Sequence, residues 1–194
     1  KPGFPANEVR IVAYSDSDWA GCLATRRSTS GGVLTLDHAT VGHWSRTQAV
    51  VALSSGEAEY YALSHAAVEC TYLKNLLSEL GYTAVSEVRS RTNCFDVYTD
   101  SNAAKSMALG GSAPSRAKHI DIRHHLIYLR DLISRKEMDV ERVTSEDNVA
   151  DILTKGLPAD RIVSMSRIWD FTEVILKRGS TSLFSRHWLR MFEF

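Results

Sequence analysis

The sequence predicts an α/β domain with a mixed five-stranded sheet and helices packed against it. Three observations predict this class. Three β-type segments follow one another near the N-terminus, a long helical segment comes next, and two further β-type segments are separated by helices. Consecutive strands joined by turns pair antiparallel, whereas a strand reached through a helical crossover pairs parallel. The 194 residues, 44% of them hydrophobic, are enough for one domain with a hydrophobic core.

The first strands are predicted from β-branched residues bounded by turn residues. Residues 9–15 ("VRIVAYS") form a strand that ends at Asp16, and a polar, glycine-containing loop follows. Residues 32–36 and 41–45 flank "DHAT", which is typical of a β-hairpin. Residues 49–53 ("AVVAL") are apolar enough to add another strand in this region.

The second part of the domain begins with a helix that the sequence caps at both ends. Ser54 and Glu57 have the S-x-x-E spacing of a capping box, and Gly81 is expected to end the helix after Leu80. The remaining predicted elements are a strand over 94–99, helices over 101–109 and 117–135, a strand over 139–143, and a helix that begins near Glu146 or Asp147.

Composition narrows the functional classes. Lys+Arg and Asp+Glu both total 23, so nucleic-acid binding would have to use a local basic patch. The cysteines Cys22, Cys70 and Cys94 show no C-x-x-C spacing, which argues against a zinc site or a disulfide scaffold and favours reduced thiols. There is neither an apolar run of about 18 residues nor a signal peptide. Because the chain starts at Lys1, we expect it to be cut from a longer precursor.

Four acidic residues occupy positions that predict a common site. Asp16 and Asp100 each end a predicted strand, and the carboxyl ends of parallel neighbours meet at one edge of a sheet, where ligands bind. Glu59 lies on the capped helix, and Asp151 lies in the last helix, which follows a strand. Asp147, at the start of that helix, is explained by a capping role.

Glu59 is preferred to Glu57 because of its place on the helix. Steps of three, four, seven, eleven and fourteen residues from Glu59 reach Ala62, Leu63, Ala66, Cys70 and Leu73, which form the apolar face expected to pack on the sheet. Glu57 lies about 160° around the helix and already has a role in the capping box.

Gathered carboxylates predict a divalent metal. Two carboxylates about 4 Å apart repel by roughly 4 kcal/mol at an effective dielectric constant near 20, so three or four need cations. Oxygen-only ligands select Mg²⁺ or Mn²⁺, and a pair of such ions is suited to hydrolysis of a phosphodiester. A single Asp at a strand end is more often a turn former or a cap, so the prediction depends on the four together.

At these residues the sequence resembles the ribonuclease H domain of copia-type LTR retrotransposon Pol polyproteins. The matching segments, in family order over residues 9–161, are "YSDSDWAG", "RRSTSGG", "VALSSGEAEYYAL", "VYTDSNAA", "RAKHIDIRHH" and "EDNVADILTKGLP". The resemblance implies a ribonuclease H fold and hydrolysis of the RNA strand of RNA–DNA hybrids during reverse transcription. It implies two Mg²⁺ ions, with Mn²⁺ as a substitute, held by Asp16, Glu59, Asp100 and Asp151.

The resemblance also implies a cellular context. We expect reverse transcriptase and integrase domains upstream in a polyprotein, and an intracellular location in cytoplasmic virus-like particles, with the nucleus as a second location. Two points differ or stay open. Asp18 shares strand parity with Asp16 and is the alternative first ligand, although Asp16 directly ends the apolar run. The histidine that many ribonucleases H carry before the last aspartate is missing from "VERVTSEDNVAD".

Candidate nucleic-acid contacts come from three segments, each with a structural alternative. Cations in "RRSTSGG" and "RAKHIDIRHH" suit backbone phosphates. Alternatively, the first segment is an ordinary polar loop, the second a solvated helix start, and Asn102 a helix cap. The predicted contacts are Arg26, Arg27, Ser28, Asn102, Arg116, Lys118, His119 and Arg123. A zinc site at His119, Asp121 and His124 is disfavoured because no further ligand completes it.

The last 33 residues lie outside the resemblance. We therefore divide the chain into a ribonuclease H domain, residues 1–161, and a C-terminal extension, residues 162–194, in which Phe184, Trp188, Met191 and Phe192 share one helical face. Two alternative functions remain open: a domain that binds or tethers the hybrid without turnover, and a nuclease of the same fold that cuts branched or duplex DNA.

Overall fold

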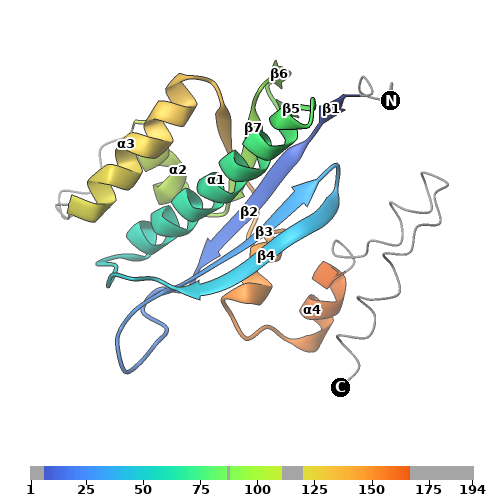
Figure 1. The fold of residues 1–194 in the computed structure, drawn as a ribbon. Helices are drawn as coiled ribbons and strands as arrows, with labels where there is room; N and C mark the ends of the chain where they lie inside the picture. The colour runs from blue at the N-terminus through green and yellow to red at the C-terminus, as the bar shows by residue number, and fades with distance from the viewer. Residues whose placement is uncertain (1–6, 87, 111–119, 167–194) are drawn as a thin grey trace.

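The central feature of the computed structural model is a five-stranded mixed sheet (Figure 1). The structure describes residues 7–86, 88–110 and 120–166. The strands are β2 (Ile11–Ser17), β3 (Thr29–Leu36), β4 (Ala39–Thr47), β7 (Phe95–Thr99) and β8 (Met138–Arg142), in the order β4-β3-β2-β7-β8. β2, β3 and β4 pair antiparallel, whereas β7 and β8 pair parallel to β2 and to each other. This confirms the predicted mixed sheet.

The predicted hairpin joins β3 to β4 through a two-residue turn. Asp37 and His38 both have positive φ, 48° and 74°, which a tight hairpin of this twist requires. The side chain of Asp37 also accepts a hydrogen bond from the Arg10 backbone nitrogen at 2.9 Å. Asp is one of the residues that tolerates this conformation, which explains why "DHAT" works as a turn.

Helix α1 (Ser55–Glu79) packs against the sheet and has the caps that the sequence predicts. Ser54 is the N-cap and accepts a hydrogen bond from the Glu57 backbone nitrogen at 3.2 Å, while Glu57 Oε2 accepts from the Leu53 backbone nitrogen at 3.0 Å. Gly81, just after the C-cap, has φ +84°. The predicted apolar face is buried in the core, except that its last member, Leu73, is half-buried.

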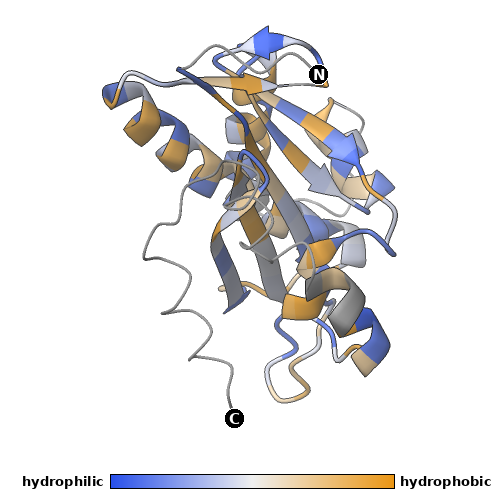
Figure 2. Cartoon of the chain, turned by 90° about the vertical axis from the view of Figure 1, so that its right-hand side faces the viewer, coloured by the Kyte–Doolittle hydropathy of each residue, from blue (hydrophilic) through white to orange (hydrophobic). Residues whose placement is uncertain are grey.

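The other helices are shorter. α2 (Asn102–Ala108) and α3 (Ile120–Ser134) lie beside α1, while a 3₁₀ helix, η1 (Val149–Leu153), and α4 (Ala159–Ser166) follow β8 (Figure 1). Hydrophobic and hydrophilic residues alternate along the helical ribbons, as expected when one face of each helix packs inward (Figure 2). No helix among the described residues is long and apolar enough to cross a membrane.

Two predicted elements are wrong. Residues 49–53 form no strand, because the Ala52 carbonyl accepts from Trp19 Nε1 at 3.1 Å and the Leu53 nitrogen donates to Glu57. The helix expected from Glu146 or Asp147 is instead η1, which Asn148 caps by accepting from the Ala150 nitrogen at 3.3 Å.

The structure also contains a small sheet that the sequence did not predict. It consists of β1 (Glu8–Val9), β5 (Thr83–Ser86) and β6 (Arg91–Thr92), in the order β1-β5-β6. Strands of two residues, as in β1 and β6, or four, as in β5, are too short to show a clear periodicity. This sheet connects the segment before β2 with the segment between α1 and β7.

Candidate metal centre

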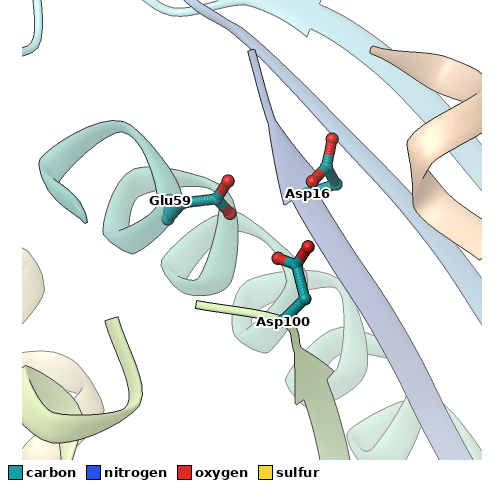
Figure 3. A group of neighbouring side chains, drawn as sticks. All are labelled: Asp16, Glu59 and Asp100. Atoms are coloured by element: carbon teal, nitrogen blue, oxygen red, sulfur yellow. The ribbon is translucent and has the colours of Figure 1, made fainter. Parts of the chain in front are cut away.

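Three of the predicted acidic residues come together at one edge of the main sheet. Asp16 is the penultimate residue of β2, Asp100 directly follows β7, and Glu59 lies in the second turn of α1. β2 and β7 run parallel with Ser15 opposite Thr99, so the next residue on each strand is an aspartate at the same level. One carboxylate oxygen from each residue lies within 4.8 Å of the others (Figure 3).

Glu59 is the acid whose ionisation is most strongly affected. Its burial, together with the nearby Asp16 and Asp100 carboxylates, raises its pKa to about 9, although Lys155 and the Ser17 backbone act in the opposite direction. Glu59 Oε2 is buried and has no hydrogen-bond partner. A buried carboxylate oxygen without a partner is costly, so the metal-free protein holds a proton on Glu59 at neutral pH.

These residues fit a hard divalent cation. The group offers only oxygen ligands, which is the donor set that Mg²⁺ and Mn²⁺ prefer. The unpartnered Glu59 oxygen is available for coordination, and a divalent charge would offset the repulsion among the three acids. Among the histidine, cysteine and acidic side chains of the described residues, these three lie close enough to one another to bind one metal ion.

Asp151, the fourth predicted acid, approaches Asp16 through a lysine and does not belong to the group of three. Lys155 Nζ lies 3.0 Å from Asp16 Oδ1 and 2.9 Å from Asp151 Oδ1. Burial lowers the pKa of Lys155, but its hydrogen bonds to Asp151 and Asp16 outweigh burial and raise it, so the ammonium stays charged. Burial raises the pKa of Asp151, and the hydrogen bond from Lys155 opposes this effect.

Comparison with known proteins finds relatives among transposon polyproteins, although no family model matches. The chain is 32% identical over 158 residues to a retrovirus-related Pol polyprotein from transposon TNT 1-94 of Nicotiana tabacum, which covers 81% of this chain and 11% of the relative. It is 33% identical over 151 residues to that from transposon RE1 of Arabidopsis thaliana, covering 78% of this chain and 10% of the relative. The chain thus spans about a tenth of these relatives' length.

Solved structures with a similar fold are RNase H domains. The N-terminal RNase H domain of a Mycobacterium tuberculosis protein aligns with a TM-score of 0.53 at 18% identity, over 82% of this chain and 97% of that one. This chain is an RNase H-like domain related to transposon Pol polyproteins. An RNase H1 isolated from compost aligns with the domain at a TM-score of 0.53 and 17% identity, over 75% of this chain and 92% of that one.

Two polar residues near the loop after β2 of this RNase H-like domain, Asp18 and Ser28, form hydrogen bonds within the protein. The Thr29 nitrogen donates to Asp18 Oδ1, so Asp18 closes the loop and lies outside the group of three acids. Ser28 is fully buried and accepts from the Ala20 nitrogen at 2.9 Å. The expected contact between Ser28 and a phosphate is therefore not supported, because its hydroxyl faces the protein.

The other predicted nucleic-acid contacts divide by position. Arg26 and Arg27 are exposed in the loop after β2, and Asn102 is exposed two residues after Asp100, so all three are accessible and stay predicted contacts. Ser101, not Asn102, is the N-cap of α2. Arg116, Lys118 and His119 lie outside the described residues, as does the side chain of Arg123, so these contacts stay predictions.

Sequence reasoning missed three residues that contact the acids. Lys155 bridges Asp16 and Asp151, and Thr154 Oγ1 donates to Asp16 Oδ2. Ser145 Oγ donates to Asp100 Oδ2 at 2.7 Å from the stretch that lacks the family histidine. The i,i+4 spacing of Asp151 and Lys155 was a usable signal, because such pairs meet on one face of a helix.

Proposed function

We propose that this RNase H-like domain hydrolyses the RNA strand of RNA–DNA hybrids, using divalent metal ions held by its carboxylates. The observation that carries the proposal is the convergence of Asp16, Glu59 and Asp100 at the sheet edge, with a buried Glu59 oxygen that has no partner. The relatives, which are retrovirus-related Pol polyproteins from transposons, and the RNase H fold support the substrate class. A further structure of similar fold, an RNase H1 with a TM-score of 0.52 and 17% identity, is in complex with an RNA/DNA hybrid.

The chain's own residues have distinct roles in this proposal. Asp16, Glu59 and Asp100 would hold Mg²⁺, with Mn²⁺ as a substitute, and Asp151 would join them from η1. When bound, the ions would activate a water for attack on the phosphodiester and stabilise the leaving oxygen. Ser145 orients Asp100 through its hydrogen bond.

We assign hybrid binding to exposed polar residues in the loop after β2 and at the start of α2. Arg26 and Arg27 in the loop after β2 would contact backbone phosphates, and Asn102 would contact the strand near Asp100. Arg116, Lys118, His119 and Arg123 remain proposed contacts on the basis of the sequence alone. Because the chain as a whole carries no net charge, these local cations must supply the electrostatic attraction.

The test is cleavage of an RNA–DNA hybrid in Mg²⁺ by the wild type and by Asp100→Asn. We expect Asp100→Asn to lower the rate by about 100-fold or more, because it removes a charged metal ligand. The matched control is Asp131→Asn on α3, whose side chain is 54% exposed and forms an ion pair with Arg135. Wild-type activity in Asp100→Asn, or equal losses in both variants, would contradict the assignment.

A second candidate function has one observation in its favour. Lys155 lies between Asp16 and Asp151, so part of the expected ligand set is already neutralised by a cation of the protein. A domain that binds and tethers the hybrid without turnover would tolerate this arrangement. Tight hybrid binding with no cleavage in either Mg²⁺ or Mn²⁺ would favour this function. Cleavage of branched or duplex DNA, with hybrid left intact, would instead indicate another nuclease activity.

The relatives support the polyprotein part of the proposed context, whereas the location is proposed from the sequence resemblance alone. We place the domain within a longer Pol polyprotein, next to a reverse transcriptase domain that generates the hybrid, in cytoplasmic virus-like particles or the nucleus. Coexpression of the domain with the upstream part of its polyprotein, followed by copurification, tests this partnership.

A further inference from the structure

Lys155 occupies an unusual place beside the proposed metal centre. Its ammonium contacts two almost fully buried carboxylates, with 0% of the Asp16 side chain and 4% of the Asp151 side chain exposed. The Lys155 side chain itself is 40% exposed, so it reaches the two acids from the rim of the site. One positive charge therefore lies between two buried negative charges at the edge of the metal centre.

The contacts of Asp16 place Lys155 on a carboxylate that the proposed metal ion would also use. Asp16 Oδ1 accepts from Lys155, and Asp16 Oδ2 accepts from the Thr154 hydroxyl. Each Asp16 oxygen already accepts one hydrogen bond, so a cation that coordinates Asp16 shares an oxygen with one of these donors or displaces it. The hydroxyl is neutral and can rotate, whereas an ammonium about 4 Å from a divalent ion is repelled by roughly 8 kcal/mol at an effective dielectric constant near 20.

We propose that Lys155 is an internal counter-ion that holds Asp16 and Asp151 together in the metal-free protein and swings out when a divalent ion binds Asp16. This inference rests on the proposed function, because it takes the acids as metal ligands. The exposed, flexible lysine stem allows the ammonium to move into water without a change in the backbone. Arg161 Nη2, 3.7 Å from Asp151 Oδ2, remains to support Asp151 after Lys155 has left.

The proposal makes Lys155 a positioning residue that weakens metal binding. Replacing it with methionine removes the competing charge and leaves the repulsion between Asp16 and Asp151 unrelieved, so a divalent ion gains more on binding. We expect Lys155→Met to bind Mn²⁺ about tenfold more tightly than the wild type, which corresponds to about 1.4 kcal/mol. A lysine with a merely structural role would leave the affinity unchanged or would support it.

The experiment is a Mn²⁺ titration of the full chain followed by electron paramagnetic resonance of the free ion. Lys105→Met is the matched control, because Lys105 forms a 2.9 Å ion pair with Glu141, which is not one of the four acids. Its Mn²⁺ affinity should equal that of the wild type. Thermal unfolding gives a second measurement: Lys155→Met should melt lower without metal and gain more from Mn²⁺ than the wild type does.

Lys155→Arg keeps the proposal testable if Lys155→Met does not fold. A guanidinium holds carboxylates with two parallel hydrogen bonds, so this variant should bind Mn²⁺ more weakly than the wild type. Equal or weaker Mn²⁺ binding by Lys155→Met, or tighter binding by Lys155→Arg, would overturn the proposal. If the wild type still cleaves hybrid in that case, the proposed function stands and only the role of Lys155 is lost. Absence of Mn²⁺ binding by the wild type and Lys155→Met would contradict both.

Discussion

Buried acidic residues in this protein differ in whether a cation or only a neutral donor stabilises their charge. Away from the metal centre, Asp96 on β7 and Asp139 on β8 face each other in register and are both buried. Asp139 pairs with Arg91 at 2.9 Å, whereas Asp96 accepts a 2.6 Å hydrogen bond from the Ser86 hydroxyl. Burial raises the pKa of Asp96 to about 6, and the Asp139 charge adds to this effect. Ionisation of Asp96 therefore lowers the stability of the folded protein.

We predict that Asp96→Asn changes the pH dependence of stability. Because the pKa of Asp96 rises from 3.8 to about 6 on folding, the folded protein binds more protons than the unfolded chain between these pH values. The wild type should therefore lose stability as pH rises from about 4 to about 6, and the variant should lose about 2 kcal/mol less. Urea unfolding at closely spaced pH values measures this difference.

Asp139→Asn provides the contrast at the same level of the sheet. It leaves Arg91 without its carboxylate partner and should lower stability at pH 7, where Asp96→Asn raises it. Identical pH profiles for the wild type and Asp96→Asn would show that the environment of Asp96 is not as described.

Some residues of the site were predictable from the sequence, and others were not. The positions of Asp16 and Asp100 followed from two strand ends, and that of Glu59 followed from an apolar helical face; the structure brings these three together. Lys155 was missed because its partner Asp16 is distant in sequence, and only the fold brings the two together. Ser28 was misplaced because a serine in a polar loop gives no sign of whether its hydroxyl turns inward.

At the scale of elements, an ion pair fixes α1 to the turn between α3 and β8. Lys74 on α1 contacts Glu137, which directly precedes β8, and only 6% of the Lys74 side chain is exposed, compared with 22% of Glu137. The hydrogen bond from Lys74 lowers the pKa of Glu137. Glu137 has a second partner in Arg135 at 3.4 Å. Lys74 therefore depends more on this ion pair than Glu137 does, because Glu137 is more exposed and has a second partner.

We predict that Glu137→Gln destabilises the protein more than Lys74→Met does. The first variant leaves a buried ammonium without its carboxylate, at a cost of about 3 kcal/mol. The second leaves a more exposed carboxylate that still pairs with Arg135, at a cost of about 1 kcal/mol. Chemical denaturation at pH 7 measures both values, and the reverse order would contradict this description of the pair.

Gly31 sets how closely η1 approaches the sheet. A Cβ atom at Gly31 would lie 2.7 Å from Thr154 Cγ2, 3.0 Å from Leu153 Cβ and 3.1 Å from the Ala150 carbonyl oxygen. Gly31 also pairs with Asp16 across β2 and β3. The close contact therefore positions the segment that carries Asp151 against the strand that carries Asp16.

We predict that Gly31→Ala costs about 2 kcal/mol of stability, because the added methyl group displaces η1. It should also slow hybrid cleavage, since Asp151 moves with η1. The control is Gly42→Ala on β4, where a Cβ would meet Leu34 at an ordinary 3.8 Å. If thermal unfolding shows equal effects for the two substitutions, close packing at Gly31 is not what holds η1.

Elements with strong local signals were predictable, and those formed by distant contacts were not. The capping box and Gly81 bound α1, and "DHAT" marked the hairpin between β3 and β4. β5 is short and pairs with β1 on one side and with β6 on the other, so this sheet depends on contacts between segments distant in sequence. Residues 49–53 look like a strand, but Trp19 and Glu57 take up backbone groups that a neighbouring strand would need.

At the scale of the whole molecule, parallel pairing in the centre of the sheet creates the site. β7 lies beside β2 although β3, β4, α1, β5 and β6 separate them in sequence, and this crossover brings Asp100 level with Asp16. The succession of strands and helices predicted parallel pairing after the crossover, whereas the place of β7 beside β2 comes from the structure. The division at residues 161 and 162 stays a prediction, because α4 runs from Ala159 to Ser166 and residues 167–194 lie outside the described part of the chain.

The central claim is that Glu59 of α1 takes part in catalysis at the sheet edge, whereas Glu57 of the same helix stabilises the fold. Glu59 and Glu57 are both buried, at 9% and 5% exposure, and both can be replaced by glutamine. The most direct measurement is therefore the rate at which Glu59→Gln and Glu57→Gln cleave the labelled RNA strand of an RNA–DNA hybrid in Mg²⁺. We predict that Glu59→Gln loses at least about 100-fold in rate while Glu57→Gln keeps the wild-type rate. Full activity in Glu59→Gln, or an equal loss in Glu57→Gln, would contradict the account.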